Sequence, residues 1–321
     1  MASWKAGAVA QAWRAMCDKA GSRTGALHPA IRGVGWMMLA AFGSSAMNGI
    51  IRVLSADLHA FEIAFFRNLF ALIVLLPLIW RAGAASLRTT RPGLHVLRGV
   101  LNAVSMLSFF YAVTVTPLAT VAALNFTAPL FASVLAALLL REMVGLRRIV
   151  GILVGFSGAL VILRPGIAAP SAGELLVLLS SAAWAAALID IKILARTDTP
   201  LTITAYAAFF LTPICLVAAI PFWTWPDLTG LGLLALCGIL GNISQISIAK
   251  AFSAAETTQV LPGDFTKLLW AALIGYVFFA ELPDVWTFLG GTLIFASVLY
   301  VAYREARVRP ASAQAGRSAG A

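Results

Sequence analysis

Residues 117–142 read PLATVAALNFTAPLFASVLAALLLRE, and residues 264–284 read DFTKLLWAALIGYVFFAELPD. The first stretch is apolar over roughly the 20 residues that a helix needs to cross a bilayer. Its Phe126-Thr127 pair recurs as Phe265-Thr266, and Glu142 recurs as Glu281 at the same offset. The two stretches therefore predict a membrane protein with an internal repeat.

The composition of the whole chain supports this prediction. Of 321 residues, 61% are hydrophobic and 11% are charged, against about 25% charged residues in a soluble domain. A mean hydropathy of +0.92 excludes a cytosolic enzyme and a disordered or fibrous protein. The cysteines and histidines are scattered without ligand spacing, so we expect no disulfide framework, no metal site and no cofactor; they are Cys17, Cys215, Cys237, His28, His59 and His95.

A window of about 20 apolar residues predicts an all-α integral membrane protein with ten spanning helices. The connections between them are too short to form a soluble domain. The predicted spans are 34–54, 60–80, 96–115, 118–140, 148–164, 173–195, 200–220, 228–249, 257–280 and 285–303.

The basic residues give the predicted orientation. The net charge is +10, and with the N-terminus in the cytoplasm only Arg52 and Arg164 fall on the outer side, while Arg67 and Lys267 fall within helices. One helix more or fewer would destroy this asymmetry, so the positive-inside rule favours ten helices with both termini cytoplasmic, in the inner membrane. The excess positive charge is thereby explained by orientation and does not indicate a nucleic-acid partner.

The repeat divides the chain into two halves of five helices. We expect a cytoplasmic arm at 1–32, a first repeat at 33–166, a second at 173–305 and a disordered cytoplasmic tail at 306–321. Because five is odd, the second half enters the membrane upside down. Inverted repeats are typical of secondary transporters, whose site lies near the midplane between the halves.

Four segments resemble one known family. They are FRNLFALIVLLPL (66–78), residues 117–142, GILVGFSGALVILRPG (151–166) and residues 264–284. The chain resembles the EamA-type, ten-helix carriers of the drug/metabolite transporter superfamily, and the last segment resembles the branch with bacterial riboflavin and S-adenosylmethionine uptake carriers. The resemblance implies a central cavity among helices 1, 3, 4, 6, 8 and 9, with helices 5 and 10 packed outside it. It implies a monomer or homodimer in the lipid bilayer.

Charges predicted to lie in the membrane are functional candidates, because each costs several kcal/mol there. Asp264 and Lys267 are three residues apart, on one helix face. The preceding Leu261-Pro262-Gly263 predicts an opened backbone. Asp264 is then a contact for a substrate cation or a proton acceptor; the alternative is a fixed structural ion pair. Trp270 is a candidate for stacking on substrate or for facing lipid.

Two further groups of charges lie in predicted helices 2 and 6. Glu62 and Arg67 are five residues apart, about 140° around a helix, so they do not make a good pair. Arg67 is either a structural anchor or part of the gate. At the end of helix 6, Lys192 fits a positive-inside anchor, and Asp190 is a candidate for proton coupling.

Uncharged polar and aromatic residues complete the predicted substrate site. The amides are the stronger candidates because a buried amide is unfavourable unless it is hydrogen-bonded; the alternative is interhelical contact. The set is Asn48, Asn102, Tyr111, Asn125, Trp184, Asn242 and Gln245. Gly151, Gly155 and Gly290 instead predict close helix packing.

We predict a secondary transporter that moves a small polar metabolite by alternating access, with uptake of riboflavin or an adenosyl compound preferred. Export of amino acids or related metabolites is the alternative. No GxxxxGK[ST] sequence is present, so ATP is not the direct energy source, and proton coupling or exchange is expected. HExxH and GxSxG are also absent, which disfavours an intramembrane enzyme and leaves no catalytic residues to name. Two inverted halves in one chain disfavour a channel.

Overall fold

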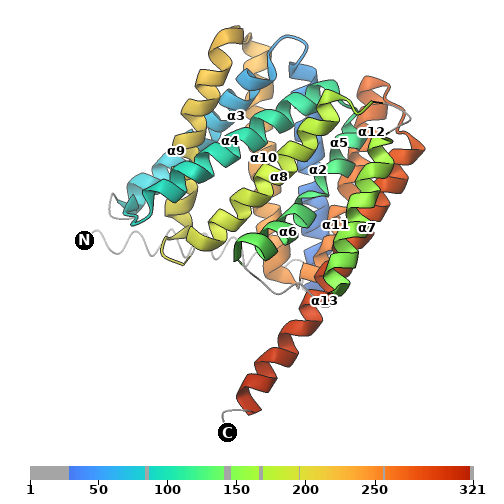
Figure 1. Ribbon diagram of the computed structural model, residues 1–321. Helices are drawn as coiled ribbons and strands as arrows, with labels where there is room; N and C mark the ends of the chain where they lie inside the picture. Colours follow the sequence, from blue (N-terminus) through green and yellow to red (C-terminus); the bar gives the residue numbers. More distant parts are fainter. Residues whose placement is uncertain are drawn as a thin grey trace.

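The computed structural model describes residues 29–83, 87–140, 146–165, 169–194, 196–255 and 257–318, and all regular structure within them is helical. The helices form a bundle (Figure 1). In chain order the α-helices are α2 (Pro29–Leu54), α3 (Ala60–Ala82), α4 (Pro92–Val115), α5 (Leu118–Asn125), α6 (Ala128–Leu140), α7 (Leu146–Leu163), α8 (Ala172–Leu194), α9 (Pro200–Ala219), α10 (Leu228–Ala254), α11 (Thr257–Asp264), α12 (Thr266–Phe279) and α13 (Val285–Ser318).

Eight helical segments in the described part of the chain are long and apolar enough to cross a membrane. Two of them join consecutive α-helices, α5 with α6 and α11 with α12, and a third continues from α9 into a short 3-10 helix, Ile220–Phe222. Arg148–Leu163 is a shorter apolar helix. Each predicted span coincides with a helix or with such a pair. The largest difference is the end of α13 at Ser318, beyond the predicted end at 303; α2 starts at Pro29 and α10 ends at Ala254, each five residues outside its predicted span.

Two helix pairs form the interior, α2 with α10 and α4 with α8. In the first pair the Ser244 hydroxyl donates to the carbonyl of Ala40 at 2.9 Å. In the second pair the Ser105 hydroxyl donates to the carbonyl of Ser180 at 3.0 Å. Small residues allow this close approach, and each of these serine hydroxyls is paired across the contact.

Helices α7 and α13 pack against each other at the side of the bundle (Figure 1). A Cβ on Gly290 would lie 2.5 Å from the carbonyl oxygen of Gly158, so the contact requires glycine. The Ser297 hydroxyl donates to the carbonyl of Gly151, and Gly155 also lies in this contact. The small-residue stripe therefore packs the helices as its spacing predicts.

At one end of the bundle, which we call the Glu281 end, Arg52 connects several segments. Arg52, in the last turn of α2, donates to the carbonyls of Val113 and Thr116 at 2.7 and 3.0 Å. It also forms an ion pair with Glu281 at 2.9 Å, and the same carboxylate accepts from the backbone N–H of Leu118. Four segments are thereby tied together: α2, the α4–α5 connection, α5 and the α12–α13 connection.

The tail differs from its prediction. We expected disorder from residue 306, but α13 continues to Ser318 and projects away from the bundle (Figure 1). The helix continues here because the tail is rich in alanine, the strongest helix former. The predicted N-terminal arm lies almost entirely outside the described residues.

Candidate functional site

Two helices are interrupted at equivalent positions of the repeat. The Thr127 hydroxyl donates to the carbonyl of Leu124, and the Thr266 hydroxyl donates to the carbonyl of Gly263, both at 2.7 Å. The rings of Phe126 and Phe265 stack with centroids 6.1 Å apart. The two interruptions therefore pack against each other in the interior.

The position of the second interruption corrects the prediction from Leu261-Pro262-Gly263. These three residues lie within α11, and the helix breaks at Phe265 instead. Proline removes its own N–H, but α11 accommodates that loss. The Thr266 hydroxyl bonds back to the preceding turn, as serine and threonine do where a helix bends.

The predicted pair of Asp264 and Lys267 is confirmed as a contact, with 3.2 Å between Lys267 Nζ and Asp264 Oδ1. The carboxylate side chain is 25% exposed and the ammonium side chain 17%. The Ser45 hydroxyl of α2 donates to the carbonyl of Lys267 at 3.2 Å. Both charges thus remain partly accessible where α2 meets the interrupted helix, so they are available to a polar ligand.

Two of the predicted amides lie buried near this interior. The side-chain oxygens of Asn48 on α2 and Asn102 on α4 are buried and have no hydrogen-bond partner among the described residues. Asn125, directly before the first interruption, and Asn242 on α10 are half-buried. Buried amide oxygens without partners are favourable contacts for a donor on a ligand.

Arg67 on α3 is the most isolated charge in the interior. Its Nη1 donates to the side-chain oxygen of Asn68 at 3.3 Å, and its Nε has no partner in the part of the chain that the structure describes. A Cβ on Gly241 of α10 would lie 3.2 Å from Nη2. No described carboxylate is within ion-pair distance. Glu62 instead accepts hydrogen bonds from Thr224 and from the backbone of His59, so the poor pairing of Glu62 with Arg67 is confirmed.

The remaining predicted site residues are not brought into this interior by any described contact. Tyr111 and Trp184 are 36% and 39% exposed, and Gln245 is exposed. Trp270 packs edge-on against Phe42 with centroids 5.1 Å apart. The helical period alone did not separate these positions from Asn48 and Asn102.

Sequence reasoning missed most of a buried ionic cluster at the opposite end of the bundle, which we call the Asp198 end. His95 and Arg98 of α4, Asp190 of α8 and Asp198 of the α8–α9 connection meet there. Asp190 alone was a candidate. The available signal was the position of Arg98 and Asp190 near the ends of the predicted spans 96–115 and 173–195. The family resemblance places these two spans around one cavity.

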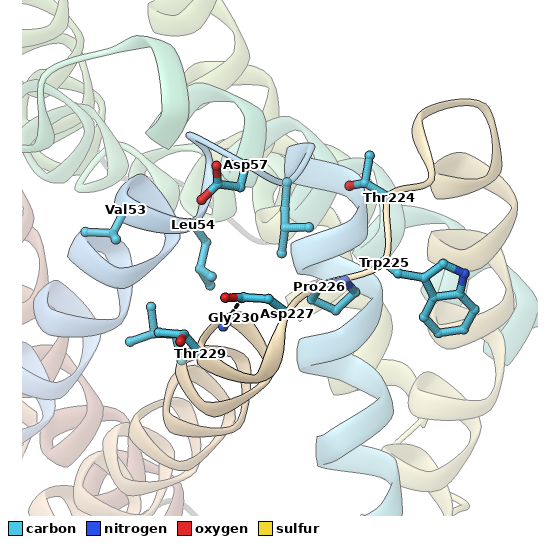
Figure 2. Close-up of a pocket in the computed structure, with 11 residues that line it drawn as sticks. Val53, Leu54, Asp57, Thr224, Trp225, Pro226, Asp227, Thr229 and Gly230 are labelled. Atoms are coloured by element: carbon cyan, nitrogen blue, oxygen red, sulfur yellow. Dashed lines mark hydrogen bonds between the residues drawn. The ribbon is translucent and has the colours of Figure 1, made fainter.

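A pocket of about 470 Å³ opens at the Glu281 end, between the end of α2 and residues 224–233. Figure 2 shows Asp57 and Asp227 on facing segments of it, with the Trp225 indole at one side. The Asp227 carboxylate caps α10 by accepting from the N–H of Gly230 at 2.6 Å. Val53 lies eight residues beyond Ser45, about 12 Å along α2, so this pocket is separate from the Asp264–Lys267 pair.

The comparison with known proteins decides the family. The model of the EamA-like transporter family matches the chain twice, over residues 31–164 and 171–303. The chain belongs to this family. It is a multi-pass membrane protein of the drug/metabolite transporter superfamily and a transporter of small metabolites, not an enzyme.

Several named relatives of this EamA-family transporter are similar over nearly their whole length. It is 33% identical to the S-adenosylmethionine uptake transporter of Rickettsia felis, covering 87% of this chain and 95% of the relative. It is 31% identical to the riboflavin transporter of Vibrio cholerae (87% and 96% covered) and to the pseudopaline exporter CntI of Pseudomonas aeruginosa (83% and 94%). A crystal structure with 16% identity matches the fold at a TM-score of 0.55, covering 85% of this chain and 98% of that one.

Proposed function

We propose that this chain is a secondary transporter that takes up S-adenosylmethionine, or a closely related adenosyl compound, by alternating access. It has ten spanning helices arranged as two inverted repeats, 33–166 and 173–305, and lies in the inner membrane with both termini in the cytoplasm. The observation that carries the proposal is the pair of interrupted helices that meet at Phe126 and Phe265, since broken helices at the midplane form the sites of such transporters.

Contacts related by the repeat support the inverted arrangement. The Ser105–Ser180 bond between α4 and α8 corresponds to the Ser244–Ala40 bond between α10 and α2. Ser105 and Ser244 are 139 residues apart, the same offset that separates Phe126 from Phe265, and Ala40 and Ser180 are 140 residues apart, one residue more. Matching contacts on both sides are expected when two halves pack about a pseudo-two-fold axis.

The charges in the interior favour an adenosyl compound over a flavin. S-adenosylmethionine carries a sulfonium and an ammonium group, which suit the Asp264 carboxylate, and a carboxylate, which suits the Arg67 guanidinium. A neutral isoalloxazine would leave the Arg67 guanidinium without an anionic partner, which is unfavourable inside a membrane, whereas Asp264 is already paired with Lys267. The similarity to S-adenosylmethionine uptake transporters agrees with this choice.

The second candidate function is export of amino-acid-like metabolites, and one relative supports it, the pseudopaline exporter. The same charges would serve a zwitterionic export substrate. Direction of transport distinguishes the two proposals, because an importer and an exporter accumulate substrate on opposite sides.

The test is uptake into proteoliposomes. We expect saturable entry of labelled S-adenosylmethionine that excess unlabelled compound suppresses, and we expect Asp264→Asn to abolish it without reducing insertion into the membrane. The Glu174→Gln variant is the control, because Glu174 caps α8 through the N–H of Ser171, far from Asp264, and glutamine keeps an acceptor there. Normal uptake by the Asp264→Asn variant would contradict the role of Asp264. Failure of S-adenosylmethionine to stabilise the purified protein would contradict the proposed substrate.

A further inference from the structure

The ionic cluster at the Asp198 end contains one closely paired histidine and carboxylate. His95 Nε2 lies 2.6 Å from Asp198 Oδ2, and the Thr89 hydroxyl donates to the same oxygen at 2.6 Å. The His95 ring is completely buried and stacks on Tyr206 of α9 with centroids 4.5 Å apart. This pair fixes α4 to the connection between α8 and α9.

Next to it lie two charged side chains that are not satisfied. Asp190 of α8 is 4% exposed, and neither of its carboxylate oxygens has a hydrogen-bond partner among the described residues. Arg98 of α4 is 8% exposed, and its Nε and Nη1 are likewise without partners in the described chain. The two groups interact electrostatically but lie outside ion-pair distance.

Burying a carboxylate without hydrogen bonds is strongly unfavourable, and binding a proton removes its charge. The surrounding groups do not supply another solution. His95 bonds Asp198 through Nε2, and although it acts electrostatically on Asp190, its Nδ1 makes no hydrogen bond to that carboxylate or to any other described group. Tyr206 stacks on His95, and Lys192 on the same helix is an exposed side chain. The described residues of α5 and α6, which also pack on α8, include no ionisable side chain.

We propose that Asp190 is the residue at which this transporter binds its coupling proton, and that Arg98 is the positioning residue that displaces the proton. This rests on the transport function proposed above. In the conformation described here Asp190 carries the proton and Arg98 is held apart. When α4 and α8 shift so that Arg98 comes within ion-pair distance, the O–H bond of Asp190 breaks and the proton leaves to the aqueous phase then in contact with the site. When Arg98 withdraws, a proton from the opposite phase re-forms that bond, so each cycle carries one proton.

The first test does not depend on a substrate. Infrared difference spectra of the purified protein at neutral pH should contain the stretch of a protonated carboxyl group. The band should disappear in Asp190→Asn and persist in Glu174→Gln. A spectrum of Asp190→Asn that retains the whole band would overturn the proposal, because Asp190 would then be ionised in this state.

The second test separates coupling from transport itself. In proteoliposomes, Asp190→Asn should lose accumulation of S-adenosylmethionine driven by a pH gradient by at least about tenfold, while exchange of labelled for unlabelled substrate continues. Asp190→Glu should restore driven accumulation. Wild-type accumulation by Asp190→Asn, or joint loss of exchange and accumulation that Asp190→Glu does not restore, would overturn the coupling role. Failure of exchange in the wild type would instead count against the proposed substrate.

Discussion

The Arg67 guanidinium is surrounded by neutral groups, and these neighbours indicate whether its role is structural or in ligand binding. Its contacts are Asn68 and the space over Gly241, with no described carboxylate at ion-pair distance. A purely structural arginine in a membrane normally pairs with a carboxylate or several carbonyls. An arginine that keeps a free Nε in the described interior is better suited to an anionic group on a ligand.

We therefore expect Arg67→Gln to weaken binding of S-adenosylmethionine about 10- to 100-fold, because a charge-assisted hydrogen bond contributes about 1.5–3 kcal/mol. Binding of riboflavin, which has no carboxylate, should not change. Thermal stabilisation of the purified variant by each compound measures both, with Arg196→Gln on the exposed α8–α9 connection as the control. Equal weakening for both compounds would mean that Arg67 only holds the fold.

His59 makes the Glu281 end sensitive to pH. Its ring stacks on Phe222 with centroids 3.9 Å apart, and its Nδ1 accepts from the N–H of Phe61. Burial lowers the pKa of His59 below 6.5, and the nearby Glu62 carboxylate opposes this only in part. A neutral ring is therefore favoured in the folded protein.

Because the folded pKa of His59 is below the unfolded one, its contribution to stability is complete above 6.5 and is lost as the pH falls through the lowered pKa. We expect the melting temperature of the purified protein to drop more between about pH 7.5 and about pH 5 for the wild type than for His59→Gln. Identical pH profiles for the two proteins would contradict this assignment.

At the scale of elements, the contact between α7 and α13 depends on two glycines. A Cβ on Gly290 would lie 2.5 Å from both the Gly158 oxygen and Ile162 Cγ1, and backbone cannot move aside as a flexible side chain can. We expect Gly290→Ala to lower stability by roughly 1–3 kcal/mol, as overpacked interiors do. The control is Gly35→Ala on α2, where a Cβ would meet nothing within 4 Å. Denaturant or thermal unfolding in detergent compares them, and equal stabilities would argue against tight packing of these helices.

The same contact illustrates which elements the sequence predicts well. Long apolar segments and small-residue stripes report helix position and packing directly, so α7, α13 and the other helices appear near their expected residues. Breaks are harder to place. Proline at 262 and glycine at 263 are local signals, but the break at Phe265 also involves the Thr266 hydroxyl and contact with Phe126 from the other half.

Side chains that act together across elements were the least predictable. The Asp264–Lys267 pair lies within one helical segment, and its spacing was sufficient. Arg98 and Asp190 meet only because α4 and α8 pack together, and no sequence interval encodes that contact. Likewise, Tyr111 and Trp184 differ from Asn48 in exposure, which depends on the facing helices and not on their own periodicity.

At the scale of the whole molecule, different side-chain contacts join the helices at the two ends of the bundle. The Glu281 end is joined by Arg52, which binds two carbonyls and Glu281. The Asp198 end is joined by the buried His95–Asp198 pair. Alternating access requires each end to open in turn. The Arg52–Glu281 and His95–Asp198 contacts must therefore break and re-form during a cycle. The proposed proton site at Asp190 lies beside the His95–Asp198 pair.

The distribution of arginine and lysine predicts that the Asp198 end faces the cytoplasm. If the Asp198 end is cytoplasmic, a cysteine at Arg196 faces the cell interior and a cysteine at Thr229, in the pocket of Figure 2, faces the outside. Both positions are exposed. In a background with Cys17, Cys215 and Cys237 replaced by alanine, a membrane-impermeant thiol reagent should label Thr229→Cys but not Arg196→Cys in intact spheroplasts. In inside-out vesicles the pattern should reverse. Labelling of Arg196→Cys from outside would invert the orientation, and would place the proposed proton site at the opposite side of the membrane from the one that the basic residues indicate.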